Sequence, residues 1–164
     1  MRAILAALVL LGALTGAQAQ VRVERVDVLH RGIYKLGKAT TIKDKSISTG
    51  QRTTGTKITF IRSTDTIRMG DGVVFGLEIM VHGKPRGQKV PFRVIWRYPD
   101  PGLRNPATHT VKHVDDYIDP RVLDAKSTFY WQLGDPWTRV PGDWTFELWY
   151  GKRMLVSETF RLTN

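Results

Sequence analysis

Two histidines and an aspartate in one short segment are the residues best spaced for metal chemistry. His109 and His113 lie four positions apart, and Asp115 follows two positions later. In an extended strand these three side chains fall on one face, because alternate residues of a strand point to the same side. Imidazole and carboxylate ligands suit zinc or copper. The trio is therefore a candidate metal site, and the alternative is a pair of surface histidines in a polar connection.

An acidic group occupies the same stretch, and its members are Asp115, Asp116, Asp119 and Asp124. Paired carboxylates are the acid and base of glycoside hydrolases, and carboxylate oxygens also bind calcium. The calcium-loop pattern is incomplete, because its glycine and its distal glutamate are missing. The alternative is a solvated face on which the aspartates offset Lys112, Arg121 and Lys126, with a turn that begins at Asp119 and Pro120.

The sequence patterns of other enzyme classes are missing from the chain. There is no cysteine, which excludes disulfides, thiolate metal sites, iron–sulfur clusters and thiol nucleophiles. The nucleophile motifs Gly-x-Ser-x-Gly and Ser-x-x-Lys and a phosphate-binding glycine loop are also missing. The sequence therefore favours a non-catalytic protein without a cofactor. The alternative is a small metal-dependent or carboxylate-based hydrolase that uses the region of His109, His113 and Asp115.

Arginine and tryptophan side chains form a second candidate site, for binding rather than catalysis. Arg93 and Arg97 share one face of a predicted strand, and the alternation of residues 143–150 turns Trp149 to the outside of its own strand. Trp137 lies in a predicted turn, so its position in the sequence does not fix whether its side chain is exposed or covered. An exposed indole beside guanidinium groups suits a sugar ring or an anionic ligand. The alternative is a tryptophan covered by a loop or by arginine stems, since tryptophan is usually largely buried.

Alternating apolar residues predict the strands that position these side chains. A period of two is the mark of a half-buried strand, and it is clearest in residues 73–81, 91–98, 127–133, 143–150 and 154–162. Residues 57–62 and 21–29 also alternate, but each changes phase partway. The phase change in residues 21–29 predicts a bulge or an edge strand.

Two segments break this regularity. Residues 37–55 are rich in Ser, Thr, Lys and Gly and have only Ile42 and Ile47 as large apolar residues. This composition predicts a long mobile loop, with a weak edge strand as the alternative. Residues 100–124 contain several prolines, and we expect them to connect two sheets, with residues 111–118 extended.

Seven or eight short strands without a helical pattern predict an all-β fold. Glycine or proline separates the predicted strands at regular intervals. Two stacked sheets bury both aromatic-rich faces, whereas a single open sheet would expose one of them. We therefore expect an immunoglobulin-like antiparallel β-sandwich that forms one domain, residues 20–164.

The start of the chain predicts export. Arg2 precedes an almost unbroken apolar run over residues 4–14, and residues 17–19, Ala-Gln-Ala, fit the small-x-small cleavage pattern of a signal peptide. At roughly 1.5 Å per residue the apolar run is too short for a hydrocarbon core of roughly 30 Å. We therefore expect residues 1–19 to be removed and the remainder, without a transmembrane segment, to be periplasmic or secreted.

The charge of the chain restricts its partners. The chain has 25 Lys and Arg residues against 15 Asp and Glu residues, and removing Arg2 with the leader leaves 24 against 15, a net charge of +9. An exported cation meets anionic glycans, lipid headgroups and acidic proteins rather than nucleic acid. These three are the candidate partners, and simple solubility is the alternative role of the charge. The sequence does not indicate an oligomeric state.

One resemblance supports the fold. Residues 142–151, Gly-Asp-Trp-Thr-Phe-Glu-Leu-Trp-Tyr-Gly, with Leu155 and Phe160 after them, resemble the closing hairpin of immunoglobulin-like sandwiches in secreted bacterial proteins. Together with residues 32–34, Gly-Ile-Tyr, they are similar to an uncharacterised family of bacterial domains of unknown function. The resemblance covers about a fifth of the chain and implies a fold, without site residues to carry over.

Overall fold

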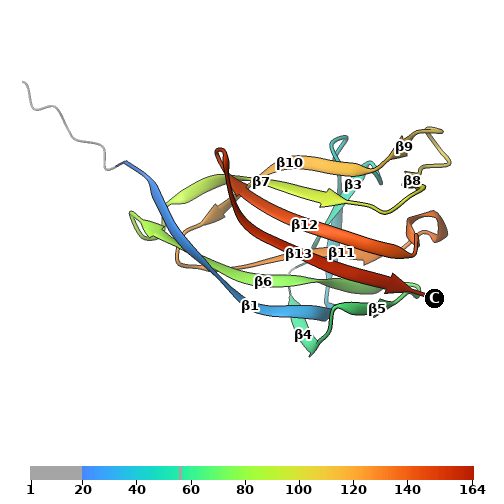
Figure 1. Cartoon of the computed structure of the whole chain (residues 1–164), viewed down its shortest axis with the longest axis horizontal. Helices are drawn as coiled ribbons and strands as arrows, with labels where there is room; N and C mark the ends of the chain where they lie inside the picture. The colour runs from blue at the N-terminus through green and yellow to red at the C-terminus, as the bar shows by residue number, and fades with distance from the viewer. Residues whose placement is uncertain (1–19, 56) are drawn as a thin grey trace, which may run out of the picture.

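The computed structural model describes residues 20–55 and 57–164, so the predicted leader lies outside the described residues. Within this part the chain is all-β apart from one short 3-10 helix, η1 (Pro136–Thr138). No helix of the described residues has the length and apolar character needed to cross a membrane. Two sheets stack as layers, with β7, β12 and β13 over β6 and β1 in Figure 1. The predicted immunoglobulin-like sandwich is confirmed.

The first layer is a four-stranded antiparallel sheet. Its order is β11-β6-β1-β4, and the bounds of its strands are β1 (Arg22–Leu36), β4 (Ile58–Ser63), β6 (Val73–Lys84) and β11 (Lys126–Leu133). The register of β1 against β6 shifts at Val23/Arg25 and at Val28/His30. These shifts confirm the bulge that the phase change predicted, because one extra residue reverses the face of every residue after it.

The second layer is a five-stranded sheet of order β10-β7-β12-β13-β5. Its strands are β5 (Thr66–Arg68), β7 (Lys89–Arg97), β10 (Val114–Val122), β12 (Gly142–Tyr150) and β13 (Arg153–Thr163). The neighbours are antiparallel except β5, which runs parallel to the end of β13. Asp119 and Pro120 lie inside β10 rather than starting a turn. An edge strand tolerates proline because its outer side needs no backbone donor.

Aromatic side chains from both sheets form the core. Phe75 of β6 meets the indoles of Trp96 and Trp144 edge-on, with ring centroids 5.9 and 5.8 Å apart. Trp96 also packs against Phe146 at 5.1 Å. All four are buried, as their alternation predicted. Each such pair contributes about 0.5–1.5 kcal/mol beyond the burial of its area.

The segment predicted as a mobile loop, with a weak edge strand as the alternative, forms two short strands, β2 (Ala39–Lys43) and β3 (Gln51–Gly55). They pair as an antiparallel hairpin. The turn between them is fixed by Ile47, which is buried in the core, and by hydrogen bonds of Ser48. A second small pair, β8 (Leu103–Arg104) with β9 (Val111–Lys112), lies within the predicted connection.

A buried carboxylate anchors the β2–β3 hairpin to the sandwich. Asp115 of β10 accepts hydrogen bonds from the Ser48 backbone N–H at 2.8 Å, from the Ser48 hydroxyl, and from the Tyr98 hydroxyl at 2.7 Å. Lys112 Nζ lies 3.8 Å from the same carboxylate. Asn105 Nδ2 donates to the Ser48 carbonyl at 3.1 Å. Sequence patterns did not reveal these contacts because Ser48 and Asp115 are 67 residues apart.

We expect Asp115→Ala to lower the free energy of unfolding by about 2–3 kcal/mol, because the Ser48 N–H and the Tyr98 hydroxyl lose their buried acceptor. The control is Asp116→Ala at the next, exposed position, where the loss should stay below about 1 kcal/mol. Urea denaturation of both variants measures the difference. Equal losses would contradict the anchoring role of Asp115.

Candidate functional site

A groove lies along one open side of the sandwich, where the edge strands β10 and β11 face each other and the β2–β3 hairpin crosses between them (Figure 1). Two cavities occupy it, of about 220 and about 260 Å³. They adjoin, because both are lined by Arg52, Thr53, Tyr117 and Tyr130. We call the two together the aromatic groove.

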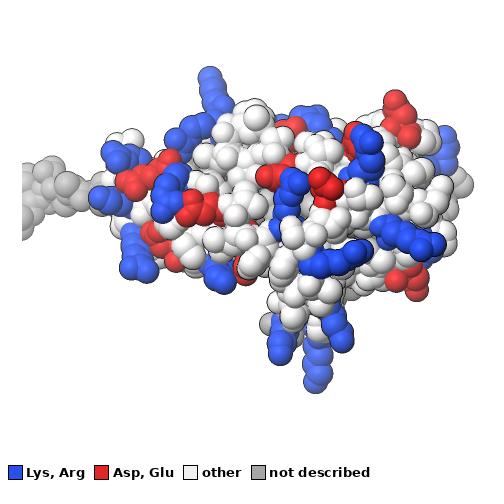
Figure 2. Space-filling view, turned by 60° about the horizontal axis from the view of Figure 1, so that its bottom comes forward, with Lys and Arg blue, Asp and Glu red and all other residues white. Residues whose placement is uncertain are grey.

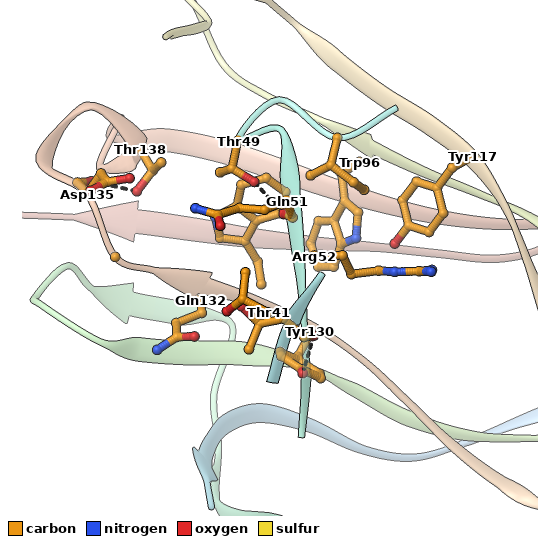
Figure 3. Close-up of a pocket in the computed structure, with 14 residues that line it drawn as sticks. Thr41, Thr49, Gln51, Arg52, Trp96, Tyr117, Tyr130, Gln132, Asp135 and Thr138 are labelled. Atoms are coloured by element: carbon orange, nitrogen blue, oxygen red, sulfur yellow. Dashed lines mark hydrogen bonds between the residues drawn. The ribbon is translucent and has the colours of Figure 1, made fainter. Parts of the chain in front are cut away.

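The first cavity combines aromatic walls with short polar side chains. Trp96 and Trp131, which also belong to the core, line it together with the half-buried Tyr117 and Tyr130. Its polar lining comes from the hairpin, from β11 and from the segment around η1, and includes Thr41, Thr49, Gln51, Gln132, Asp135 and Thr138. Figure 3 shows Arg52 and Tyr117 at one end of this cavity and Gln132 and Asp135 at the other.

The hairpin is held over the groove by a contact on the far side from Asp115. The Tyr130 hydroxyl of β11 donates to the Thr53 carbonyl of β3 at 2.7 Å. The hairpin is therefore tied to β10 at its turn and to β11 along its second strand. Both ties are to residues of the sandwich edges, so the groove is a built feature of the fold.

The second cavity contains two arginines. Arg52 comes from β3 and Arg121 from β10, and Asp119 lines the cavity with them. Arg121 Nη2 donates to Asp119 Oδ2 at 2.6 Å, and its Cζ lies 4.8 Å from the ring centroid of Phe129. Burial raises the pKa of the neighbouring Tyr117 hydroxyl, while Arg52 and Arg121 oppose part of that rise. The hydroxyl therefore stays protonated near neutral pH.

Three buried hydrogen-bond donors of the aromatic groove have no acceptor among the described residues. They are Trp131 Nε1, Arg52 Nε and Arg121 Nε. A buried donor without a partner costs about 1–3 kcal/mol, so native structures rarely keep one without a reason. All three nitrogen atoms are closed to water, whereas the Arg52 and Arg121 side chains are each 34% exposed. A ligand oxygen would therefore reach these two guanidinium groups at nitrogens other than Nε.

The structure brings three of the four sequence-predicted binding residues together on the outer face of the five-stranded sheet. Trp149 of β12 is paired with Arg93 of β7. Arg97 lies four residues further along β7, so it is on the same face of that strand. Trp149 is half-buried rather than fully exposed. Trp137 lies apart from them in η1, where it packs against the core.

Carboxylates neutralise both arginines of that face. Arg93 donates to Asp116 through two nitrogens, with Nε at 2.8 Å, and Arg97 donates to Glu147. Trp149 Nε1 donates to the same Glu147 at 2.8 Å. Arg93 and Arg97 lower the pKa of the Asp116 and Glu147 carboxyls respectively. The face is an internally paired network, and its guanidinium groups have fewer donors left for an anionic ligand.

Charges of both signs are also mixed elsewhere on the surface. Figure 2 shows Lys and Arg side chains interspersed with Asp and Glu over most of the visible face, while the lobe at the bottom of the view carries Lys and Arg without Asp or Glu. Further pairs in the structure include Arg31 with Glu158 and Arg161 with Asp143. The net positive charge is thus distributed, and local geometry has to decide where a ligand binds.

The structure does not gather the candidate metal ligands. His109 is exposed, with a positive φ of 56°, and His113 is exposed with Nδ1 at 3.6 Å from Asp100. Asp115 points inward to Ser48 and Tyr98. Among residues 20–55 and 57–164 no group of three or more His, Asp or Glu side chains is arranged to hold a metal ion.

Comparison with known proteins places the chain in a family. Residues 22–162 match the family model described as a domain of unknown function (DUF3859). The chain belongs to this family. An immunoglobulin-like protein from Pseudomonas aeruginosa has a similar solved structure, with a TM-score of 0.60, 20% identity, and coverage of 90% of this chain and 100% of that one. No curated protein sequence matches the chain.

The DUF3859 fold was predictable from the sequence, but the aromatic groove was not. Trp131 was expected in the core by its alternation with Phe129, and it does lie there, while its indole edge lines the first cavity. Arg121 was expected only as a charge partner of the aspartates. One residue in the sequence could have indicated the groove. Arg52 is the one arginine of residues 37–55, the segment predicted to be a loop.

We expect Glu147→Gln to make the free energy of unfolding decline less steeply as pH falls into the acid range. Hydrogen bonding by Arg97 is the largest cause that lowers the folded-state pKa of Glu147. The unfolded chain therefore binds this proton at higher pH, and the stabilisation is lost as pH falls through the range of about 5 to 3. Urea denaturation across that range should show a shallower decline for the variant, with less than about 1 kcal/mol lost at pH 7.

Arg97→Ala should also make the free energy of unfolding decline less steeply at acid pH, because it removes the main cause of the lowered pKa of Glu147. Arg62→Ala, an exposed arginine on β4 of the other sheet, is the matched control and should leave the curve unchanged. If Glu147→Gln and the wild type decline in parallel, the pairing of Glu147 with Arg97 carries no stability.

Proposed function

We propose that this protein is an exported, non-catalytic module that binds an oligosaccharide in the aromatic groove. Of the candidate partners, an anionic glycan fits the groove better than a lipid headgroup or an acidic protein. The groove offers aromatic rings and short polar side chains, which a sugar uses and a flat membrane surface does not. The observation that carries the proposal is this lining of aromatic rings and polar groups together with two partly exposed guanidinium groups.

The lining suits a sugar in two ways. The rings of Tyr117 and Tyr130 offer apolar faces to the C–H groups of a pyranose, and the partly exposed guanidinium groups of Arg52 and Arg121 can donate to its ring and hydroxyl oxygens. Gln51, Gln132 and the threonines supply further donors and acceptors. Each cavity is smaller than the roughly 300–1,000 Å³ of a drug-sized pocket. An extended ligand that occupies both cavities uses the groove best.

A binding role also agrees with the state of the carboxylates. Asp115, which both catalytic alternatives need, is committed to Ser48 and Tyr98. Asp116 is bonded to Arg93, and Asp119 to Arg121. Each of these carboxylates already accepts hydrogen bonds from the protein, whereas a general acid or base must be within reach of the substrate.

Export remains part of the proposal and rests on residues 1–19. Their charged start, apolar run and Ala-Gln-Ala ending follow the order of a cleavable leader. A periplasmic or secreted protein meets the glycans of the cell envelope, which is consistent with a glycan-binding groove.

Two groove variants test the binding site. We expect Tyr117→Ala to weaken oligosaccharide binding by about twofold to tenfold, because an aromatic contact contributes about 0.5–1.5 kcal/mol. Gln51→Ala should weaken it by about threefold to tenfold through a lost hydrogen bond. Binding is measured by calorimetry with members of a panel of defined neutral and acidic oligosaccharides that bind the wild type on an array.

Gln88→Ala is the matched control, since Gln88 is an exposed glutamine in the turn between β6 and β7. It should bind as the wild type does. Failure of the wild type to bind any oligosaccharide of the panel, or equal effects of Gln51→Ala and Gln88→Ala, would exclude the groove as a glycan site.

A further inference from the structure

We infer that the aromatic groove selects acidic oligosaccharides and binds one ligand carboxylate between Arg52 and Arg121. This inference rests on the proposed function, which supplies the groove and the class of ligand. It adds the place of the ligand's carboxylate and the residues that recognise it. The deciding observation is that two guanidinium groups, each 34% exposed, line one cavity in which Asp119 is the one lining carboxylate among the described residues.

Arg121 is held in position by the protein itself. Its Nη2 donates to Asp119 Oδ2 at 2.6 Å, and its Cζ lies 4.8 Å from the ring centroid of the buried Phe129. These two contacts restrict the side chain before a ligand arrives, so less rotamer entropy is lost on binding. A guanidinium has five N–H donors, and Asp119 accepts from only one nitrogen of Arg121 in these contacts.

Arg52 approaches the same cavity from the hairpin. In Figure 3 its side chain extends from β3 toward Tyr117. Asp44 Oδ2 lies 3.7 Å from Arg52 Nε, which is too far for a hydrogen bond, and Asp44 accepts its own bonds from Ser46. The guanidinium of Arg52 therefore keeps donors for a ligand at the boundary of the two cavities.

The charge balance of the second cavity favours an anion. Two guanidinium groups face one carboxylate, Asp119, among its lining residues. A carboxylate presents two coplanar oxygens that match the guanidinium fork, whereas a hydroxyl presents one. A sugar acid held there would place its ring against Tyr117 and Tyr130, which both cavities share, and the next sugar would enter the first cavity.

The arginines of the outer sheet face are weaker candidates for the same carboxylate. Arg93 already donates through Nε and Nη2 to Asp116, and Arg97 donates through Nε and Nη2 to Glu147. An anion would have to displace a fixed carboxylate from either fork. At Arg52 and Arg121 it would displace no such two-nitrogen pair, because Asp119 accepts from one nitrogen of Arg121 and Asp44 lies 3.7 Å from Arg52.

A matched pair of probes tests the selection. Hexasaccharides of uronic acids are compared, by calorimetry with the purified protein, with the same hexasaccharides after their carboxyl groups are reduced to primary alcohols. We expect the acidic forms to bind about tenfold or more tightly than the reduced forms, since hydrogen bonds to charged groups are about twice as strong as neutral ones. The difference should shrink between about 50 and about 300 mM salt, as screening increases.

Arginine variants locate the carboxylate. Arg121→Gln and Arg52→Gln should each weaken binding of the acidic forms about tenfold while leaving binding of the reduced forms nearly unchanged. The control is Arg93→Gln, because Arg93 is also a strand arginine paired with an aspartate on the five-stranded sheet. It should bind both forms as the wild type does, and circular dichroism melting checks that all three variants fold.

The outcomes separate this inference from the proposed function. Equal binding of acidic and reduced forms would overturn the charge selection and leave a neutral glycan site in the groove. A loss with Arg93→Gln as large as with Arg121→Gln would move the carboxylate to the outer sheet face and overturn the inference. Binding to vesicles with anionic lipids, without binding to either oligosaccharide form, would overturn both.

Discussion

The buried Asp115 carboxylate is the interaction on which the functional surface depends. By accepting bonds from Ser48 and Tyr98 it fastens the turn of the β2–β3 hairpin to the edge of the five-stranded sheet. The hairpin has only Ile47 to bury in the core, which is too little apolar surface to order it alone. Without the anchor, the hairpin would keep its bond from Tyr130 to the Thr53 carbonyl, but the turn next to Gln51 and Arg52 would lose its buried carboxylate.

The aromatic core and the groove share side chains, which makes the site rigid. Trp96 and Trp131 pack on Phe146 and Tyr98 from within and line the first cavity with other parts of their rings. A ligand in the groove therefore contacts residues whose rotamers are fixed by the packing of two sheets. Preorganisation of this kind lowers the entropy lost on binding.

The sequence predicted the sandwich because the alternation of apolar residues can be seen within each strand. It did not predict the groove, because the groove depends on contacts between residues far apart in the sequence. The inward positions of Phe92, Trp96 and Trp144 follow from a period of two, and the β1 bulges follow from a change of phase. The hairpin depends on a partner 67 residues away. Arg93 and Arg97 were placed on the correct face, but their carboxylate partners lie on other strands, so the sequence overstated their availability.

Nuclear magnetic resonance of the indole N–H groups tests the central claim most directly. The chain has five tryptophans, and their Nε1–H signals in the 15N-labelled protein report separately on the groove and on the outer sheet face. On titration with a uronic acid oligosaccharide, the Trp131 signal should move because this residue lines the first cavity, while the Trp149 signal should stay in place because its donor is bonded to Glu147. Movement of Trp149 with an unchanged Trp131 would contradict binding in the groove.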